Sequence, residues 1–323
     1  MNTVSLSAFG YEAEILPRRG ANLIRFAKPA LRAEALRTPE SEDGFVRDNP
    51  YLWGVPILFP PNRISGAAFT FEGRRYVFPM NEPKIGNFLH GAIHETPMEV
   101  LRAEKDRALF RFRADAEKPY LTFPHAFTMH VYFALKADGL IQQVRIRNDS
   151  SRNMPVALGF HTTFRIPFVR GGKAEDVRLR LTAGKEILRD MDTFLPTGEI
   201  RNDYPQRDEL LGGGFIPCRN TVSRHFEMTH PAEMVLTDLA SGVRVTYLPG
   251  REYRYWMVFN GGAKDFLCVE PQTWVNNCPN APFPREETGF RVLGPGQEAV
   301  FETALRIEGA ENSASLRSVK REE

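Results

Sequence analysis

The sequence contains few cysteines and no pattern that would pair them. Cys218, Cys268 and Cys278 are widely spaced and form no Cys-x-x-Cys motif. An odd, scattered set argues against a disulfide framework and against a zinc site. We therefore expect a reducing, cytoplasmic environment and no bound metal.

Long apolar runs and an excess of one charge are also missing. The chain has 42 basic and 40 acidic side chains, a formal net charge of +2, which argues against a general nucleic-acid or acidic membrane surface. No apolar run approaches the length of a membrane span, and the N-terminus lacks the basic and apolar segments of a signal peptide. We expect a soluble, unexported protein without nucleic-acid or membrane partners. Nothing in the surface pattern favours a monomer over a dimer.

Signals for nucleotide binding are absent as well. No strand–helix–strand rhythm recurs, and the triplet Gly212–Gly214 lacks the lysine and following helix of a phosphate-binding loop. The clearest group of helix formers, Pro29–Arg37, is followed by Thr38 and Pro39, so it predicts a helix of about two turns. We expect no cofactor.

Strand patterns recur along most of the chain. In Ala108–Arg113 the residues Ala108, Phe110 and Phe112 alternate with mainly polar ones, which is the period of a half-buried strand. Similar β-branched and aromatic patterns predict further strands at 130–135, 139–147, 177–181, 243–247, 254–259 and 299–307. The fold class is therefore predicted to be mainly β, with few short helices.

No linker or repeat divides the chain. Glycine, proline and phenylalanine, at 25, 24 and 24 residues, are scattered rather than clustered. We expect one domain over residues 1–308. Residues 309–323 are small and charged, which predicts a flexible C-terminal tail.

One stretch, Phe266–Trp274, suggests chemistry. Its apolar run ends on Glu270, directly before Pro271, which predicts a carboxylate at the rim of a buried strand. Such a group is either a paired structural acid or a base with a shifted pKa.

Two histidines and an arginine are the best candidates to act with Glu270. His90 and His161 each lie beside aromatic residues and close to a glycine, where a backbone can approach a ligand. Arg63 follows two prolines, and its planar guanidinium could face hydroxyls or a carboxylate. Ordinary core histidines and a surface arginine are the alternatives.

Together these four residues suggest acid–base chemistry on a polyhydroxylated substrate. A carboxylate base and an imidazole acid suit a reaction that moves two protons near neutral pH without a cofactor. Nearby aromatic residues could offer flat faces to a sugar ring, although in a β protein such residues are core by default.

Five short motifs in order give a family resemblance. The chain resembles the aldose 1-epimerases, or galactose mutarotases, in Pro61–Ile64, Phe88–Gly91, Gly159–His161, Leu195–Gly198 and Cys268–Gln272. The resemblance implies a large antiparallel β-sandwich and a small-molecule sugar as the substrate, whose anomers are interconverted without a cofactor.

The resemblance also implies roles for single residues. Glu270 would remove the proton from the anomeric O1 hydroxyl, and His161 would protonate the ring oxygen O5. Arg63 and His90 would hold sugar hydroxyls, with further substrate contacts from Asn62 and Gln272.

One position departs from the family pattern. Many members carry a sugar-binding Asp shortly before a Phe, where this chain has Ser223 and Arg224 before Phe226. Ser223 and Arg224 are therefore candidates for the pocket wall, and an arginine there would favour an anionic sugar. A hexose-6-phosphate 1-epimerase and a non-catalytic carbohydrate-binding protein remain as alternative functions.

Overall fold

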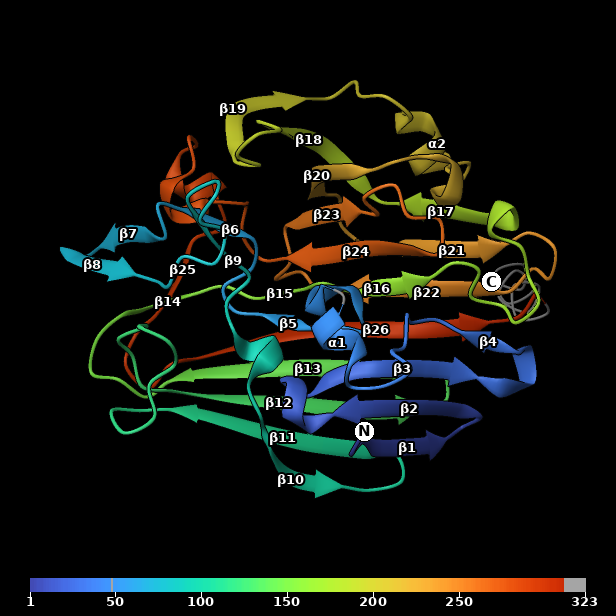
Figure 1. The fold of residues 1–323 in the computed structure, drawn as a ribbon, viewed down its shortest axis with the longest axis horizontal. Coiled ribbons are helices and arrows are strands. Elements are labelled where there is room, and N and C mark those ends of the chain that lie inside the picture. The colour runs from blue at the N-terminus through green and yellow to red at the C-terminus, as the bar shows by residue number, and fades with distance from the viewer. Residues whose placement is uncertain (48, 311–323) are drawn as a thin grey trace, which may run out of the picture.

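The computed structural model describes residues 1–47 and 49–310, and strands dominate them (Figure 1). The described ranges contain two α-helices, the short α1 (Gly44–Arg47) and α2 (Arg207–Gly212). No helix in these ranges is long and apolar enough to cross a membrane. The predicted mainly β fold class is confirmed.

An eight-stranded antiparallel sheet, here called the back sheet, forms one layer (Figure 1). In spatial order it consists of β10 (Glu99–Ala103), β11 (Arg107–Ala114), β12 (Phe127–Lys136), β13 (Gly139–Asn148), β26 (Glu298–Glu308), β22 (Arg244–Pro249), β21 (Met234–Asp238) and β17 (Val177–Leu181).

A second eight-stranded antiparallel sheet, here called the site sheet, forms the other layer. Its order is β19 (Pro196–Arg201), β18 (Ala183–Arg189), β20 (Ser223–Met228), β23 (Tyr255–Phe259), β24 (Phe266–Gln272), β15 (Gly159–Phe160) and β5 (Ile57–Leu58), with β16 (Thr163–Arg165) also paired to β24. Large buried side chains of both sheets, among them Phe133, Trp256 and Phe301, belong to one continuous hydrophobic cluster. The two sheets are therefore the layers of a β-sandwich.

Smaller sheets complete the fold. The N-terminal segment forms a four-stranded sheet of β1 (Val4–Ala8), β2 (Tyr11–Leu16), β3 (Asn22–Lys28) and β4 (Ala33–Glu34). Three two-stranded sheets pair β6 (Arg63–Ser65) with β9 (Asn87–Leu89), β7 (Ala68–Phe71) with β8 (Arg74–Val77), and β14 (Met154–Val156) with β25 (Arg291–Leu293). The 3-10 turns are η1 (Pro17–Arg19), η2 (Pro29–Leu31), η3 (Pro50–Leu52), η4 (Ile93–Glu95), η5 (Ala174–Asp176), η6 (Pro217–Arg219), η7 (Cys278–Asn280) and η8 (Arg285–Glu287).

All seven predicted strands are present, with boundaries that shift by a few residues. In β11 the predicted inward residues Ala108, Phe110 and Phe112 are buried and alternate with more exposed ones. The period-of-two pattern thus predicted both the strand and its buried face.

The predicted helix over 29–37 is wrong. Only the turn η2 forms, and Arg32 ends it in a left-handed conformation, φ 52°, by donating its backbone N–H to the Pro29 carbonyl. The chain then pairs Ala33 and Glu34 with β3. A two-turn helix is marginal without tertiary support, so strand pairing prevails.

The predicted C-terminal tail lies mostly outside the described residues, which end at Ala310. Strand β24 also differs from its prediction, because it continues two residues beyond Glu270, through Pro271 to Gln272.

Candidate active site

A cavity of about 140 Å³ lies where the site sheet meets the loops around β6, β9 and η3. It is lined by side chains from many separate segments, namely Asn49, Tyr51, Leu52, Asn62, Arg63, Leu89, His90, His161, Arg189, Phe194, Ser223, Met257, Phe259 and Glu270. We call it the site cavity. It brings together the four residues that the sequence selected for acid–base chemistry.

Glu270 reaches the cavity from the central strand β24. It pairs in register with Met257 on β23, and its side chain is only 2% exposed. On the other side of β24, the backbone N–H groups of Val269 and Thr273 donate to Thr162 and Leu158. The alternation of N–H groups along a strand places Pro271 between these two bonds. Pro271 has no N–H to donate, so this strand loses one ladder bond beside the site.

Burial dominates the electrostatics of Glu270. Removal from water raises the pKa of Glu270 to about 8, although a hydrogen bond from Gln272 and the charges of Arg189 and Arg63 oppose the shift. Glu270 therefore mostly holds its proton at neutral pH.

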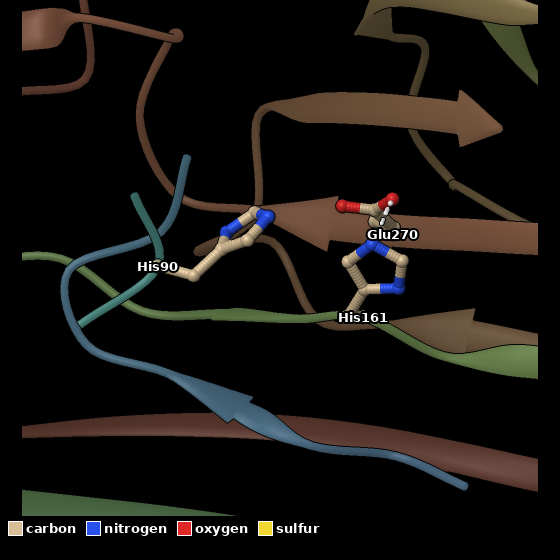
Figure 2. A group of neighbouring side chains, drawn as sticks. All are labelled: His90, His161 and Glu270. Carbon is tan, nitrogen blue, oxygen red and sulfur yellow. Dashed lines mark ion pairs between the residues drawn. The ribbon is translucent and has the colours of Figure 1, made fainter. Parts of the chain in front are cut away.

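His161 faces Glu270 from the gap between β15 and β16. Its Nε2 lies 3.2 Å from Oε1 of Glu270, drawn as a dashed line in Figure 2. Burial lowers the pKa of His161, so the imidazole is neutral at rest. Nδ1 of His161 is buried and has no hydrogen-bond partner in the described ranges, so Nε2 is the ring nitrogen available for chemistry.

Glu270 and His161 therefore share one proton across a short contact. Low dielectric favours the neutral arrangement, an acid beside an imidazole, over the carboxylate–imidazolium pair. Transfer along the contact converts one arrangement into the other without exchange with solvent. The pair can consequently present a base and an acid at the same time.

Two hydrogen bonds with the backbone of Asn62 hold His90 in place. Its own N–H donates to the Asn62 carbonyl, and the Asn62 N–H donates to His90 Nδ1 over 3.1 Å. Both residues have positive φ, 63° for His90 and 59° for Asn62, a strained conformation for residues with a Cβ. Burial holds the pKa of His90 well below its usual range. A neutral ring that accepts at Nδ1 must carry its proton on Nε2, so His90 is a fixed hydrogen-bond donor.

The same geometry bears on metal binding. His90, His161 and Glu270 could each offer a ligand atom, all within 4.8 Å of one another. A metal-bound histidine uses one nitrogen as the ligand and normally donates from the other. Nδ1 of His90 accepts instead, which leaves a protonated Nε2 without a lone pair for a cation. The trio fits a proton-transfer site better than a metal site.

Arg63 lines the cavity but is already paired. Its Nε and Nη2 donate to the two carboxylate oxygens of Glu82, each over 2.8 Å, and its guanidinium lies over the ring of Phe194. This bidentate contact compensates the charge and fixes the orientation of the fork.

Asn62 and Gln272 form a chain of hydrogen bonds that ends on Glu270. Asn62 Nδ2 donates to Gln272 Oε1 over 3.1 Å, and Gln272 Nε2 donates to Glu270 Oε2 over 3.1 Å. Asn62 also lines the cavity, whereas Gln272 is fully buried behind Glu270. Gln272 therefore contacts the carboxylate of Glu270, and its predicted substrate contact stays a prediction.

The two candidates for the pocket wall lie on opposite sides of β20. Ser223 lines the cavity, whereas Arg224 lies outside its lining. Arg224 donates through Nε and Nη2 to Glu186, which also accepts from Arg201. Adjacent strand residues point to opposite faces, so only one of the two could line the cavity.

Arg189 and Tyr51 are among the cavity residues that the sequence did not select. Arg189, at the end of β18, donates through Nη2 to the Ser223 carbonyl and hydroxyl oxygens, at 2.6 and 3.0 Å. Tyr51, from η3, places its ring 4.7 Å from that of His90 and 5.8 Å from that of His161. No local motif marks either residue. The segment of Arg189 was not among the predicted strands, and its burial does not alternate regularly.

Comparisons with known proteins agree with this geometry. The aldose 1-epimerase family model matches residues 2–306. A solved structure of a galactose mutarotase-like protein from Clostridium acetobutylicum is 30% identical and superposes with a TM-score of 0.87 over 94% of each chain.

Two curated relatives are more distant. The protein YphB of Escherichia coli is 22% identical over 284 residues, or 84% of this chain and 89% of YphB. The galactose mutarotase of Rattus norvegicus is 27% identical over 165 residues, or 49% of this chain and 44% of that enzyme. Because the family model spans nearly the whole chain, the protein belongs to the aldose 1-epimerase family.

Proposed function

We propose that this protein is a cofactor-independent aldose 1-epimerase, an isomerase that interconverts the α and β anomers of a hexose. The observation that carries the proposal is the 3.2 Å contact between His161 Nε2 and Glu270 Oε1 inside a cavity. This contact puts a carboxylate and an imidazole within reach of one small substrate.

Ring opening starts from the carboxylate–imidazolium form of the pair. Glu270 takes the proton from the O1 hydroxyl while His161 gives its proton to O5. The C1–O5 bond breaks and C1–O1 becomes a carbonyl, so the products are the open-chain aldehyde, a protonated Glu270 and a neutral His161. This is the arrangement that burial favours, which helps the opening step.

Ring closure reverses both transfers. After rotation about C1–C2, the O5 hydroxyl returns its proton to His161 and attacks C1 from the other side, and Glu270 returns its proton to O1. Each turnover ends with one proton on the pair, as it began. No net proton crosses to solvent, and no cofactor takes part.

The other residues position the substrate and the pair. His90 donates from Nε2 to a sugar oxygen, and Arg63 and Asn62 contact hydroxyls from the same wall. Gln272 orients Glu270 and favours its carboxylate by donating to Oε2. The three cysteines are buried and free, which supports the cytoplasm as the location.

The test is the approach of freshly dissolved α-glucose and α-galactose to equilibrium, followed by polarimetry or by NMR exchange. Wild-type protein is expected to exceed the buffer rate in proportion to its concentration. A rate equal to buffer on every aldose, neutral or anionic, would reject the proposal. Sugar binding in calorimetry without anomerisation would instead select a carbohydrate-binding protein.

A further inference from the structure

The site cavity contains a cation that lacks an ion-pair partner among the described residues. Of its charged lining residues, Arg63 is paired with Glu82, and Glu270 retains its proton at neutral pH. The remaining one, Arg189, has no carboxylate within ion-pair distance among residues 1–47 and 49–310. The cavity therefore has a net positive charge on one wall.

The carboxylate nearest in the fold is already occupied. Glu186, three residues before Arg189 on β18, accepts hydrogen bonds from Arg201 and Arg224 and is 6% exposed. Arg201 and Arg224 donate three hydrogen bonds to its two carboxylate oxygens, away from the cavity lining. Of Arg189, Arg201 and Arg224, only Arg189 lines the cavity, and the other two are paired with Glu186.

Ser223 accepts hydrogen bonds from only one nitrogen of the Arg189 guanidinium. Nη2 donates to the carbonyl and hydroxyl oxygens of Ser223, whereas Nε and Nη1 donate to nothing in the described ranges. A guanidinium fixed in this way offers oriented N–H donors to an incoming oxyanion. Arg189 is only partly buried, and holding a cation partly away from water without an anion still costs free energy, so a ligand that supplies the anion recovers that energy on binding.

We infer that Arg189 binds an oxyanion of the substrate, so that the preferred sugar carries a carboxylate or a phosphate in addition to its anomeric centre. This inference rests on the proposed function, because it names the substrate class of the same cavity. Ser223 serves as the positioning residue of this subsite, where an aspartate would instead neutralise the guanidinium. Arg189 also interacts with Glu270 electrostatically, and the experiment separates the two effects.

The experiment compares neutral and anionic sugars on wild type, Arg189→Met and Arg201→Met. The sugars are glucose and galactose, their uronates, and glucose 6-phosphate, with anomerisation by NMR exchange and binding by calorimetry. Arg201→Met is the matched control, because Arg201 lies outside the cavity lining and Glu186 keeps Arg224.

Wild type is expected to prefer one class of anionic sugar over glucose by about ten- to hundredfold in KM and Kd, the usual value of one hydrogen bond to a charged group. The uronates and the phosphate distinguish which oxyanion fits. Arg189→Met should reduce the ratio of anionic to neutral sugar in KM and Kd to about one, whatever its effect on the rate through Glu270, whereas Arg201→Met should keep the wild-type ratio. If Arg189→Met does not fold, the wild-type preference alone still tests the inference.

Two results would overturn the inference. Equal KM and Kd for neutral and anionic sugars on wild type would show that no oxyanion is recognised. An equal loss on both classes in Arg189→Met, with a shifted pH profile, would show that Arg189 acts only on Glu270. Failure of the proposed function looks different, because no sugar would then be turned over, and calorimetry would still report on anion preference.

Discussion

The two large sheets of this sandwich differ in regularity. In the back sheet, β12 and β13 pair without a register shift along their whole length, and the register shifts only at the edge strand β10. In the site sheet the register of β18 shifts against both of its neighbours, and the second partner of β24 is split at His161 into β15 and β16. The regularly paired strands of the back sheet contribute mainly to the core. The irregularly paired strands of the site sheet contribute side chains to the site cavity.

The interruptions coincide with the candidate site residues. Arg189 stands at the register shift of β18, His161 in the gap between two short strands, and Glu270 directly before the proline of β24. Each position lies at or beside an interruption of the pairing that a regular strand would have. Such departures from local regularity are expected where function competes with stability.

The largest expected effect is a loss of stability from a substitution in the core of the back sheet, with activity unchanged. Phe133 is fully buried on β12 and contacts the ring of Phe110. Phe133→Ala should lower the free energy of unfolding by about 3–5 kcal/mol through lost burial and a cavity. Urea unfolding measures the loss, while kcat/KM per folded molecule should stay within about twofold. A variant of normal stability but low activity would refute the division between the sheets.

The pH dependence of the rate tests the site sheet. Burial raises the pKa of Glu270 to about 8 and lowers that of His161, so the pair holds its single proton across neutral pH. Above about pH 8 the pair has no proton to give O5, and kcat/KM should fall up to tenfold per pH unit. The spontaneous rate is subtracted at each pH. A limb centred near pH 6.5, the ordinary histidine value, would contradict the assignment.

A smaller effect is expected from the hydrogen bond behind Glu270. Gln272→Leu removes the donor to Oε2 and leaves Asn62 Nδ2 without its partner. Loss of this bond should raise the pKa of Glu270 further, move the alkaline limb to higher pH and lower kcat by about tenfold. A lower kcat with an unmoved limb would mean that Gln272 is only structural.

Much of the fold could be predicted from the sequence because strand alternation is local. The period-of-two residues of β11 and β17 were buried as predicted, and the motifs around Arg63, His90, His161 and Glu270 selected residues that the fold brings to one cavity. Their roles remain predictions until activity is measured.

The rest depends on tertiary structure. Pro29–Arg37 has helical propensity, but pairing with β3 decides its conformation. Arg189 and Arg224 both lie on strands of the site sheet. Arg189 lines the cavity and, among the described residues, forms no ion pair, whereas Arg224 lies outside the lining and is paired with Glu186. No local pattern records that difference.

The central claim is that Glu270 and His161 share the proton that opens the ring. The most direct test is Glu270→Gln, assayed by NMR exchange between sugar anomers, with binding followed by calorimetry. Glu227→Gln is the matched control, since Glu227 lies on β20 outside the cavity lining. Glu270→Gln should lose roughly a hundredfold or more in rate while it still binds sugar, and the control should lose nothing. A Glu270→Gln variant that anomerises sugar at the wild-type rate would contradict the account.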